Sequence, residues 1–280
     1  MKYINPKYSS LQEVAARFKD LYANNEPFPN ISFENFFDEA FLNEVLDEFE
    51  DLDKGDTIKY ATPNEIKLAS KGENRFGTKA KEFVHFLNSE PFLLFLQELT
   101  GIEETLTPDP YFEGGGFHQT KTGGFLKIHA DFNKHKQTRL DRRLNVLIYL
   151  NKDWKDEYGG HFELWDTEMT HCVKKIRPDF NTMALFTTTD FSYHGLPNPL
   201  TCPPDRSRKS IALYYYTNGR PASEVNSGLE DHTTLFKVRA GDATDAEMVK
   251  FQKKQGAKEF MKELVPPILL RAAKKIKNGH

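Results

Sequence analysis

Cysteine is scarce in this sequence. The 280 residues include only two, Cys172 and Cys202. Two cysteines cannot form a framework of several disulfides, and they cannot supply the four thiolates of a structural zinc site. We therefore expect both side chains to be reduced thiols.

Long apolar segments and a large net charge are also lacking. No stretch approaches the length of a membrane span, and the first residues, MKYINPKYSS, lack the basic end and apolar core of a secretion signal. The formal net charge is -3 and the pI is near 6.3, so there is no general attraction to nucleic acid. We expect a cytoplasmic protein with no nucleic-acid partner and no membrane span.

The pattern of apolar residues changes from helical to β near Thr105. Helical spacing predicts helices over 11–24, 33–51 and about 78–100. Beyond them, short strands are predicted with no helical repeats between them, over 116–120, 124–131, 143–150, 160–165, 172–176, 182–187 and 208–217. This arrangement predicts a mainly β fold with flanking helices (α+β), built as a sandwich or jelly roll.

The tripeptide His129-Ala130-Asp131 lies at the end of a predicted strand. Side chains at positions i and i+2 of a strand project from one face, so both can reach the same metal ion. A third ligand has to come from another strand, and His194 follows the strand-like run 182–187. Two histidines and one carboxylate leave three positions open on one face of an octahedral ion, as in non-haem Fe(II) oxygenases. We therefore predict a metal site at these three residues.

A cation begins the apolar run 208–216. Alternation along a strand places Arg208 and Ser210 on one face, so that a guanidinium and a hydroxyl point the same way and form a plausible carboxylate clamp. Lys127 has the parity of His129 and is a second candidate for the cation. Parity alone does not decide between the two cations.

The run 144–150 carries two polar residues, Asn145 and Tyr149, on one face. That face can line a pocket while the other packs against helices. A buried tyrosine hydroxyl needs a polar partner, which a dicarboxylic acid beside the metal would supply. The alternative is a core tyrosine bonded to backbone.

Together these motifs resemble the prolyl-hydroxylase-like branch of the 2-oxoglutarate/Fe(II) oxygenase superfamily. The resemblance covers about residues 107–220, and the ordered set is specific although each motif alone is common. The motifs are, in chain order, His129-x-Asp131, Tyr149-Leu150-Asn151-Lys152-Asp153-Trp154, Gly159-Gly160, His194 and Arg208-x-Ser210.

The resemblance implies a double-stranded β-helix, a cupin-like jelly roll, and a set of cofactors. Fe(II) is the metal, 2-oxoglutarate and O2 are co-substrates, and ascorbate is a candidate reductant. Hydroxylation of a primary substrate, with release of succinate and CO2, is the implied reaction. The substrate is left open among a small molecule, a saccharide or lipid intermediate, and a prolyl-type peptide.

The resemblance also implies roles for single residues. His129, Asp131 and His194 would be the catalytic iron ligands. Arg208 would bind the C5 carboxylate of 2-oxoglutarate and Tyr149 would contact the same molecule, with Ser210 and Asn145 as further co-substrate residues.

The glycine-rich segment 109–119 precedes the metal strand and is expected to border the mouth of the barrel. Tyr111, His118 and Gln119 are then expected to face the substrate, and a solvated bend in an edge strand is the alternative. In the family a tyrosine tends to lie ten residues before the first ligand, where this chain has Gln119. The substrate side of the family pattern therefore does not carry over directly.

We expect three regions in one integrated catalytic domain. Residues 1–104 form a helical region that packs on the core, 105–222 form the double-stranded β-helix, and 223–280 form a helical, basic segment. The last part contains nine Lys or Arg and two acidic residues over 250–280. It either covers the core with a solvated basic face or docks on an anionic partner or membrane surface.

A non-catalytic jelly-roll module that binds or senses metal is the alternative to an enzyme. Retention of Arg208-x-Ser210 beside the ligand set argues against it, because a sensor needs no co-substrate clamp. The remaining histidines have no partner at ligand spacing and are expected at the surface, namely His85, His135, His161, His171, His232 and His280.

Overall fold

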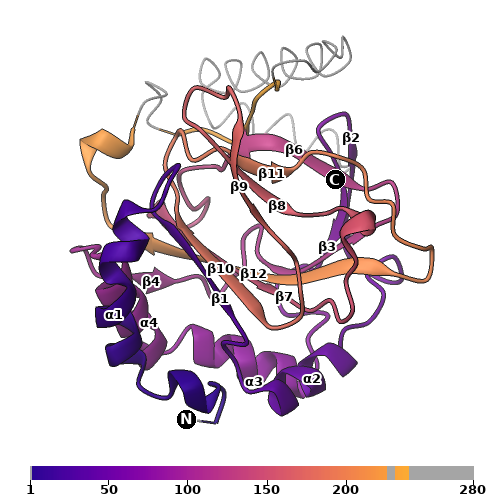
Figure 1. The fold of residues 1–280 in the computed structure, drawn as a ribbon, viewed down its shortest axis with the longest axis horizontal. Helices are drawn as coiled ribbons and strands as arrows, with labels where there is room; N and C mark the ends of the chain where they lie inside the picture. The colour runs from indigo at the N-terminus through magenta and orange to yellow at the C-terminus, as the bar shows by residue number, and fades with distance from the viewer. Residues whose placement is uncertain (1, 226–230, 240–280) are drawn as a thin grey trace, which may run out of the picture. The chain divides into compact units, whose positions relative to one another are not determined.

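The computed structural model describes residues 2–225 and 231–239 (Figure 1). The α-helices are α1 Leu11–Asn24, α2 Glu39–Asp47, α3 Thr78–Leu87 and α4 Glu90–Thr100. The strands are β1 Asn30–Glu34, β2 Ile58–Thr62, β3 Glu65–Ala69, β4 Thr107–Pro108, β5 Gly116–Lys121, β6 Phe125–Ala130, β7 Asp141–Tyr149, β8 Phe162–Trp165, β9 Cys172–Ile176, β10 Thr182–Thr187, β11 His194–Leu196, β12 Ser207–Thr217 and β13 Leu235–Phe236. Short 3-10 helices cover η1 Pro6–Tyr8, η2 Asp156–Tyr158 and η3 Ala222–Glu224.

These strands form one antiparallel sheet that is nearly closed into a barrel. Neighbouring strands follow the order β1, β10, β7, β12, β5, β3, β6, β11, β8, β9, with β2, β4 and β13 attached at its sides. The two ends of this order approach each other, since Lys174 Nζ in β9 donates to Asn30 Oδ1 in β1 at 2.8 Å. The predicted mainly β, jelly-roll fold with flanking helices is confirmed.

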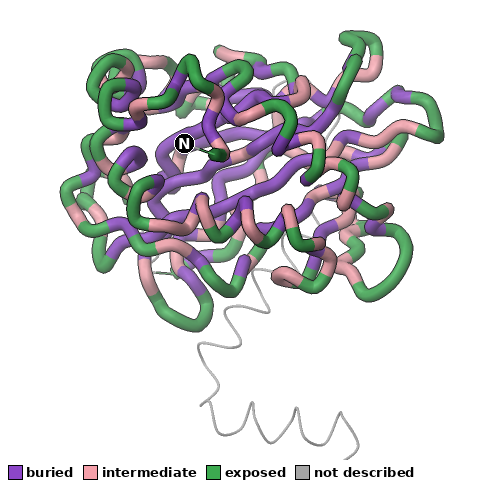
Figure 2. Tube along the Cα trace, turned by 90° about the horizontal axis from the view of Figure 1, so that it is seen from below, coloured by how far each residue is buried: buried purple, intermediate pink, exposed green. Residues whose placement is uncertain are grey.

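The helices cover one outer side of the barrel. In Figure 1, α1 to α4 lie along the side formed by β1, β10, β7 and β12, whereas β6, β8, β9 and β11 lie on the opposite side. A large cluster between helices and sheet includes Phe36, Phe83 and Val146. A second cluster fills the inside of the barrel with Tyr149, Phe162, Leu164, Ile176 and Phe186 among others. Figure 2 shows the buried strands in purple and the exposed loops in green.

Local sequence accounts for the helix ends. The Ser10 hydroxyl accepts a hydrogen bond from the Glu13 N–H, so α1 begins where the prediction placed it. The predicted helix over 78–100 is two helices. Pro91 lacks an N–H donor and is tolerated only in a first turn, so a new helix begins at Glu90 after Ser89.

Helix prediction over 33–51 was too long. Residues Asn30–Glu34 pair with β10 as strand β1, and only Glu39–Asp47 are helical. The sequence NISFE alternates buried and less buried positions, which suits a strand better than a helix. The predicted strands after Thr105 are all present with ends shifted by a few residues, and β4, β11 and β13 were not predicted.

The N-terminal region contributes β1, β2 and β3 to the sheet, so it is less purely helical than expected. The division at residues 104 and 222 stays a prediction. The basic part of the predicted C-terminal segment, 250–280, lies outside the described residues.

The two cysteines agree with the expectation that both are reduced thiols. Cys172 and Cys202 are free. Across 2–225 and 231–239, no helix combines the length and hydrophobicity that a membrane span requires. The cytoplasmic location stays a prediction.

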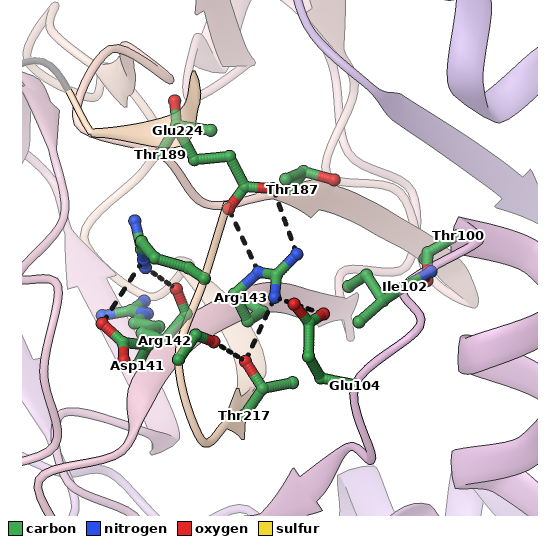
Figure 3. A network of polar contacts seen from close by, with 12 residues as sticks. Thr100, Ile102, Glu104, Asp141, Arg142, Arg143, Thr187, Thr189, Thr217 and Glu224 are labelled. Atoms are coloured by element: carbon green, nitrogen blue, oxygen red, sulfur yellow. Dashed lines mark hydrogen bonds and ion pairs between the residues drawn. The ribbon is translucent and has the colours of Figure 1, made fainter. Parts of the chain in front are cut away.

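A buried guanidinium joins four segments at one rim of the sheet (Figure 3). Arg143 in β7 donates to Glu104 at 2.8 Å, to Thr217 Oγ1 at 3.1 Å and to Glu224 at 3.1 Å. Burial raises the pKa of Glu224, although the charge of Arg143 acts against it. Arg143 therefore keeps a partly buried carboxylate in its charged form.

We expect Arg143→Met to destabilise the fold. It removes three hydrogen-bonded partners at once and leaves the Glu224 carboxylate, 17% exposed, without this counter-charge. Breaking a buried ion pair on one side costs about 3–5 kcal/mol. Urea unfolding followed by circular dichroism measures the loss. Arg17→Met, on the exposed side of α1, is the control and should change stability by less than about 0.5 kcal/mol. Equal effects of the two substitutions would refute the structural role of Arg143.

Candidate active site

Three side chains with metal-ligating atoms meet inside the barrel. His129 lies in β6, Asp131 follows the end of that strand, and His194 begins β11, where it pairs in register with His129. One ligand atom from each residue lies within 4.8 Å of the others, and all three residues are buried. The structure thus brings together the three residues that the spacing predicted.

Hydrogen bonds orient both imidazole rings. Nδ1 of His129 lies 2.8 Å from the Lys127 carbonyl oxygen, and Nδ1 of His194 lies 2.8 Å from the Ser192 carbonyl oxygen. A carbonyl only accepts, so each Nδ1 carries the proton and each Nε2 keeps its lone pair. The Nε2 atoms lie 3.5 and 3.4 Å from the carboxylate oxygens of Asp131. A divalent cation among these acceptors satisfies all of them, so the donor set fits Fe(II).

The charge states of the ligands also suit a metal. Burial acts to raise the pKa of Asp131, but Arg142 and the two histidines outweigh it and hold this pKa well below its usual range. Burial lowers the pKa of His194 to about 3, with the charge of Asp131 in partial opposition. At neutral pH the protein therefore presents a carboxylate and a neutral imidazole, which are the forms that bind metal.

Two residues behind Asp131 fix its orientation. Asn145 Nδ2 donates to Asp131 Oδ2 at 2.7 Å, and Arg142 Nη2 lies 3.1 Å from the same oxygen. Arg142 Nε in turn donates to Asn145 Oδ1 at 2.9 Å. The guanidinium is stacked 3.4 Å from the ring centroid of Tyr214. The amide of Asn145 is thus committed to the metal ligand, whereas the sequence suggested contact with the co-substrate.

Sequence analysis missed Arg142. Where β7 pairs with β12, Tyr215 lies opposite Leu144 and Tyr216 lies opposite Arg142. Strand β7 therefore has one extra residue, Arg143, between these two pairs. This irregularity changes the alternation of side chains, so parity counted back from Asn145 fails. Two consecutive arginines at the start of an apolar strand were the available signal, since a buried arginine needs an anion.

Arg208 and Tyr149 lie beside each other on neighbouring strands. Tyr149 in β7 pairs with Ser210 in β12, and the Arg208 guanidinium carbon lies 4.8 Å from the Tyr149 ring centroid. Burial lowers the pKa of Arg208 and raises the pKa of Tyr149. The Tyr149 hydroxyl is buried without a hydrogen-bond partner among the described residues. Such a pair is complementary to a carboxylate.

Gly160 lets the backbone approach this arginine. Its carbonyl accepts from Arg208 Nε at 2.8 Å. The glycine has a φ of +75°, and a Cβ there would lie 2.7 Å from Leu200 Cδ2 and 3.1 Å from Arg208 Cδ. Within the described chain Arg208 forms no ion pair with a carboxylate. The Gly160 carbonyl therefore orients the Arg208 guanidinium through Nε. The remaining N–H groups of the guanidinium are suited to bind a carboxylate.

An irregularity in β6 weakens the case for Lys127 as the co-substrate cation. His194 pairs with His129, but Leu196 pairs with Leu126, so β6 contains one extra residue between these pairs. The parity argument that placed Lys127 with His129 does not hold across such a bulge. The Lys127 ammonium instead lies 5.4 Å from the ring centroid of Phe125 in the same strand.

The three residues expected at the substrate side are separated by the structure. Gln119 pairs with Lys209 and His118 pairs with Ser210, so the two side chains lie on opposite faces of β5. The Gln119 side chain accepts from the Leu52 N–H and donates to Ser207 Oγ. Gln119 therefore does not share the face of His118, because neighbouring strand residues alternate, and its contact with a substrate stays a prediction.

His118 and Tyr111 remain candidates near the mouth. His118 shares the face of Ser210, and its Nε2 lies 2.9 Å from the Gly114 carbonyl oxygen. Burial, with the nearby charge of Lys67, lowers the pKa of His118 to about 3, so the ring is neutral at physiological pH. Tyr111 is 56% exposed, with its ring 6.0 Å from that of His135.

A hairpin that was not predicted lies beside His118. Strands β2 and β3 pair with each other, and β3 also pairs with β5 and β6. Its side chains on the His118 face include Lys67, whose ammonium lies 3.2 Å from Glu65 and 4.9 Å from the Tyr60 ring centroid. A short signal for these strands was present in the sequence, because apolar and polar residues alternate in Ile58-Lys59-Tyr60 and in Glu65-Ile66-Lys67-Leu68.

Strand β13 was also missed, and it reaches the metal strand. Leu235 pairs with Ala130 and Phe236 pairs with His129. The ring centroids of Phe236 and His129 are 5.4 Å apart. A residue far along the chain therefore covers one side of a metal ligand.

Two of the histidines expected at the surface are buried. His135 lies 3.2 Å from Asp109, and His232 lies 2.8 Å from Asp190. Each ring thus has a buried carboxylate partner that sequence spacing could not reveal. His85 and His171 have side chains more than half exposed, and that of His161 is 25% exposed. His280 lies outside the described residues.

Comparison with known proteins agrees with this geometry. The model of the 2OG-Fe(II) oxygenase superfamily matches residues 115–216. The mouse (Mus musculus) prolyl 3-hydroxylase OGFOD1 is 29% identical over 79 residues, and the match spans 27% of this chain and only 14% of the mouse protein.

Solved structures share the fold. A Pseudomonas putida prolyl-4-hydroxylase has a TM-score of 0.54 at 13% identity and covers 73% of this chain and 100% of its own. A Trichoplax adhaerens prolyl hydroxylase, solved with a hypoxia inducible factor peptide fragment, has a TM-score of 0.54 at 18% identity and covers 75% of this chain and 92% of its own.

Residues 115–216 therefore match the 2OG-Fe(II) oxygenase superfamily, and the described chain shares its fold with prolyl-4-hydroxylase structures. This family uses Fe(II), 2-oxoglutarate and O2, and the buried ligand set of this chain fits that metal.

We expect Asn145→Ala to weaken metal binding. It removes the hydrogen bond to Asp131 and loosens Arg142. Losing such an outer partner typically costs about 10- to 100-fold in metal affinity. Titration with Mn(II), followed by electron paramagnetic resonance, measures the change, and Asn24→Ala at the exposed end of α1 is the control. Unchanged metal affinity with a raised requirement for 2-oxoglutarate would instead place Asn145 on the co-substrate.

Proposed function

We propose that this chain is an Fe(II)- and 2-oxoglutarate-dependent dioxygenase that hydroxylates a prolyl-type peptide and releases succinate and CO2. The carrying observation is the buried Tyr149 hydroxyl beside Arg208, which has no hydrogen bond of normal geometry within the described residues and lies in the same interior as the ligand set. Tyr149 packs in one cluster with Phe186, whose ring centroid is 4.6 Å from that of His194. A sensor module would not need a carboxylate clamp there.

In this proposal each residue of the site has a separate role. His129, Asp131 and His194 hold the iron, with Asn145 and Arg142 positioning the carboxylate ligand. Arg208 and Ser210 bind the distal carboxylate of 2-oxoglutarate. Tyr149 donates its hydroxyl to the same carboxylate. Bound iron and 2-oxoglutarate supply the oxidising chemistry with O2, and the apolar interior around Phe186 excludes water.

The peptide class is supported by the relatives. The mouse relative is a prolyl 3-hydroxylase, and the Trichoplax structure holds a peptide fragment. In this chain His118, which shares the face of Ser210, and the exposed Tyr111 are our candidates for contact with the peptide. A neutral His118 can accept or donate a hydrogen bond to a peptide group without adding charge.

We propose that residues 1–104, 105–222 and 223–280 act as one catalytic unit. The hairpin β2–β3 supports this for the first part, because it completes the sheet between β5 and β6. The third part remains a prediction.

A peptide-dependent turnover assay tests the proposed substrate class. The full chain is incubated aerobically with Fe(II), ascorbate, 2-oxoglutarate and pooled proline-containing peptides. We expect peptide-stimulated succinate and a product heavier by one oxygen atom on proline. Matched peptides with alanine in place of proline should give only slow uncoupled succinate. Stimulation by small molecules, saccharides or lipid intermediates, and not by any peptide, would overturn the peptide assignment and leave the oxygenase assignment intact.

A further inference from the structure

A groove lies on the outer face of the sheet, behind the strand that carries Arg208. It has a volume of about 440 Å³ and is bordered by residues after α2, by β5, by the segment that follows β7 and by the start of β12. The side chains that matter are Asp51, Gln119, Lys152, Arg206, Ser207 and Lys209. Cavities of this size accommodate small molecules.

The groove is separate from the metal site. Along β12, Ser207 and Lys209 alternate with Arg208 and Ser210, so the two pairs point to opposite faces. Gln119, opposite Lys209 across the ladder, also faces outward. A molecule in the groove therefore lies across the strand from Arg208 and does not enter the barrel.

Three cations of the groove have no carboxylate partner within the described chain. They are Lys152, Arg206 and Lys209. Their contacts are of other kinds, because Arg206 donates to the Lys152 carbonyl and the Lys209 ammonium lies 5.0 Å from the ring centroid of Phe49. Lys152 lies over the ring of Phe180 at 5.3 Å.

The fourth cation of the groove, Lys121, differs from these three because it has carboxylate partners. Lys121 lies 2.9 Å from Asp51 and 3.4 Å from Asp53, so its charge is neutralised locally. Asp205 is a second acidic residue of the lining and is exposed. The side of the groove formed by Lys152, Arg206 and Lys209 thus keeps a surplus of positive charge.

The same side offers directed hydrogen-bond donors. Ser207 Oγ accepts from Gln119 Nε2, which leaves the hydroxyl proton of Ser207 free to donate. The guanidinium of Arg206 presents further N–H groups. Burial lowers the pKa of the half-buried Lys209 ammonium, with the charge of Asp51 in partial opposition, and a bound anion would further offset the cost of burial.

We propose that this groove binds the phosphate group of a small molecule between Arg206, Lys209 and Lys152. Arginine matches a phosphate with two parallel hydrogen bonds, and lysine adds charge without fixed direction. The apolar lining of Leu46 and Leu150 suits the body of an organic phosphate. The proposal does not rest on the oxygenase activity.

Thermal unfolding of the full chain, without added metal, tests this site. The probes are inorganic phosphate and phenyl phosphate, with chloride at matched ionic strength and benzoate as the carboxylate analogue. A ligand that binds only the folded chain raises Tm with its concentration. We expect a saturable rise with both phosphates and little with chloride or benzoate. Equal rises with all four would overturn the proposal in favour of general screening.

Variants locate the effect. The double variant Lys209→Met/Arg206→Gln should weaken phosphate binding at least tenfold in calorimetric titration. Methionine at position 209 keeps the aliphatic contact with Phe49. Lys152→Met should also weaken phosphate binding. Because Lys152 is exposed, this variant tests the site even if the double variant is unstable. Lys81→Met on the exposed face of α3 should bind as the parent does. Arg208→Met should also bind phosphate normally, because that side chain faces the interior. Parent-like binding in the double variant, or loss in Arg208→Met, would contradict the site.

Discussion

His129→Ala and Asp131→Asn should each reduce succinate formation to the background level. His129→Ala removes one of three ligand atoms that lie within 4.8 Å of one another, and Asp131→Asn replaces the carboxylate ligand by a neutral amide. No other cluster of this kind occurs among residues 2–225 and 231–239. Turnover is measured as succinate released in the presence and absence of peptide. Substantial activity in both variants would show that the iron is held elsewhere.

The choice of asparagine at position 131 has a structural reason. Arg142 is buried against this carboxylate at 3.1 Å, so alanine would leave an uncompensated buried charge. That costs about 3–5 kcal/mol and could unfold the chain for reasons unrelated to iron. Asparagine also removes the negative charge, but it keeps an oxygen acceptor toward Arg142 and so leaves that guanidinium hydrogen-bonded. His129→Ala removes no such charge, and equal unfolding curves for it and the parent establish that lost activity reflects lost metal.

Arg208→Met should raise the concentration of 2-oxoglutarate needed for half-maximal rate more than any other substitution in the pocket. Loss of one partner of a buried, charged hydrogen-bonded pair costs about 2–5 kcal/mol. This corresponds to a rise of about thirtyfold or more in KM for 2-oxoglutarate. Tyr149→Phe removes one hydrogen bond, worth about 1 kcal/mol, and should raise KM roughly fivefold.

Stability separates this effect from damage to the fold. Burial lowers the pKa of Arg208, so methionine in its place should leave the chain without ligand at least as stable as the parent. Lys127→Met is the matched control for a second cation, and it should leave the requirement for 2-oxoglutarate unchanged. A defect in Lys127→Met with none in Arg208→Met would mean that the wrong cation was assigned.

The sequence alone predicted those parts of the site in which spacing and strand geometry coincide. His129 and Asp131 are two residues apart at a strand end, and Arg208 and Ser210 share a face of an apolar run. These positions follow from alternation, which depends only on neighbours in the chain.

The missed parts depend on contacts between distant segments. Arg142 reaches Asp131 because of an irregular register in β7, and β13 pairs with β6 although about a hundred residues separate them. The hairpin β2–β3 has only a short alternation of apolar and polar residues, and β3 pairs with β5 and β6, which lie far along the chain. The face of Gln119 was inferred from glycine content and not from alternation, so its place on the outer side of β5 was not predicted.

The most direct test of the account is an anaerobic titration of the full chain with Fe(II) and 2-oxoglutarate, followed by visible absorption. We predict a weak charge-transfer band that appears only when both are present and saturates with one of each per chain. His194→Ala should show no band, and Arg208→Met should need far more 2-oxoglutarate to reach it. Absence of the band in the parent, or a band of equal strength in His194→Ala, would contradict the assignment of this barrel as an Fe(II) and 2-oxoglutarate site.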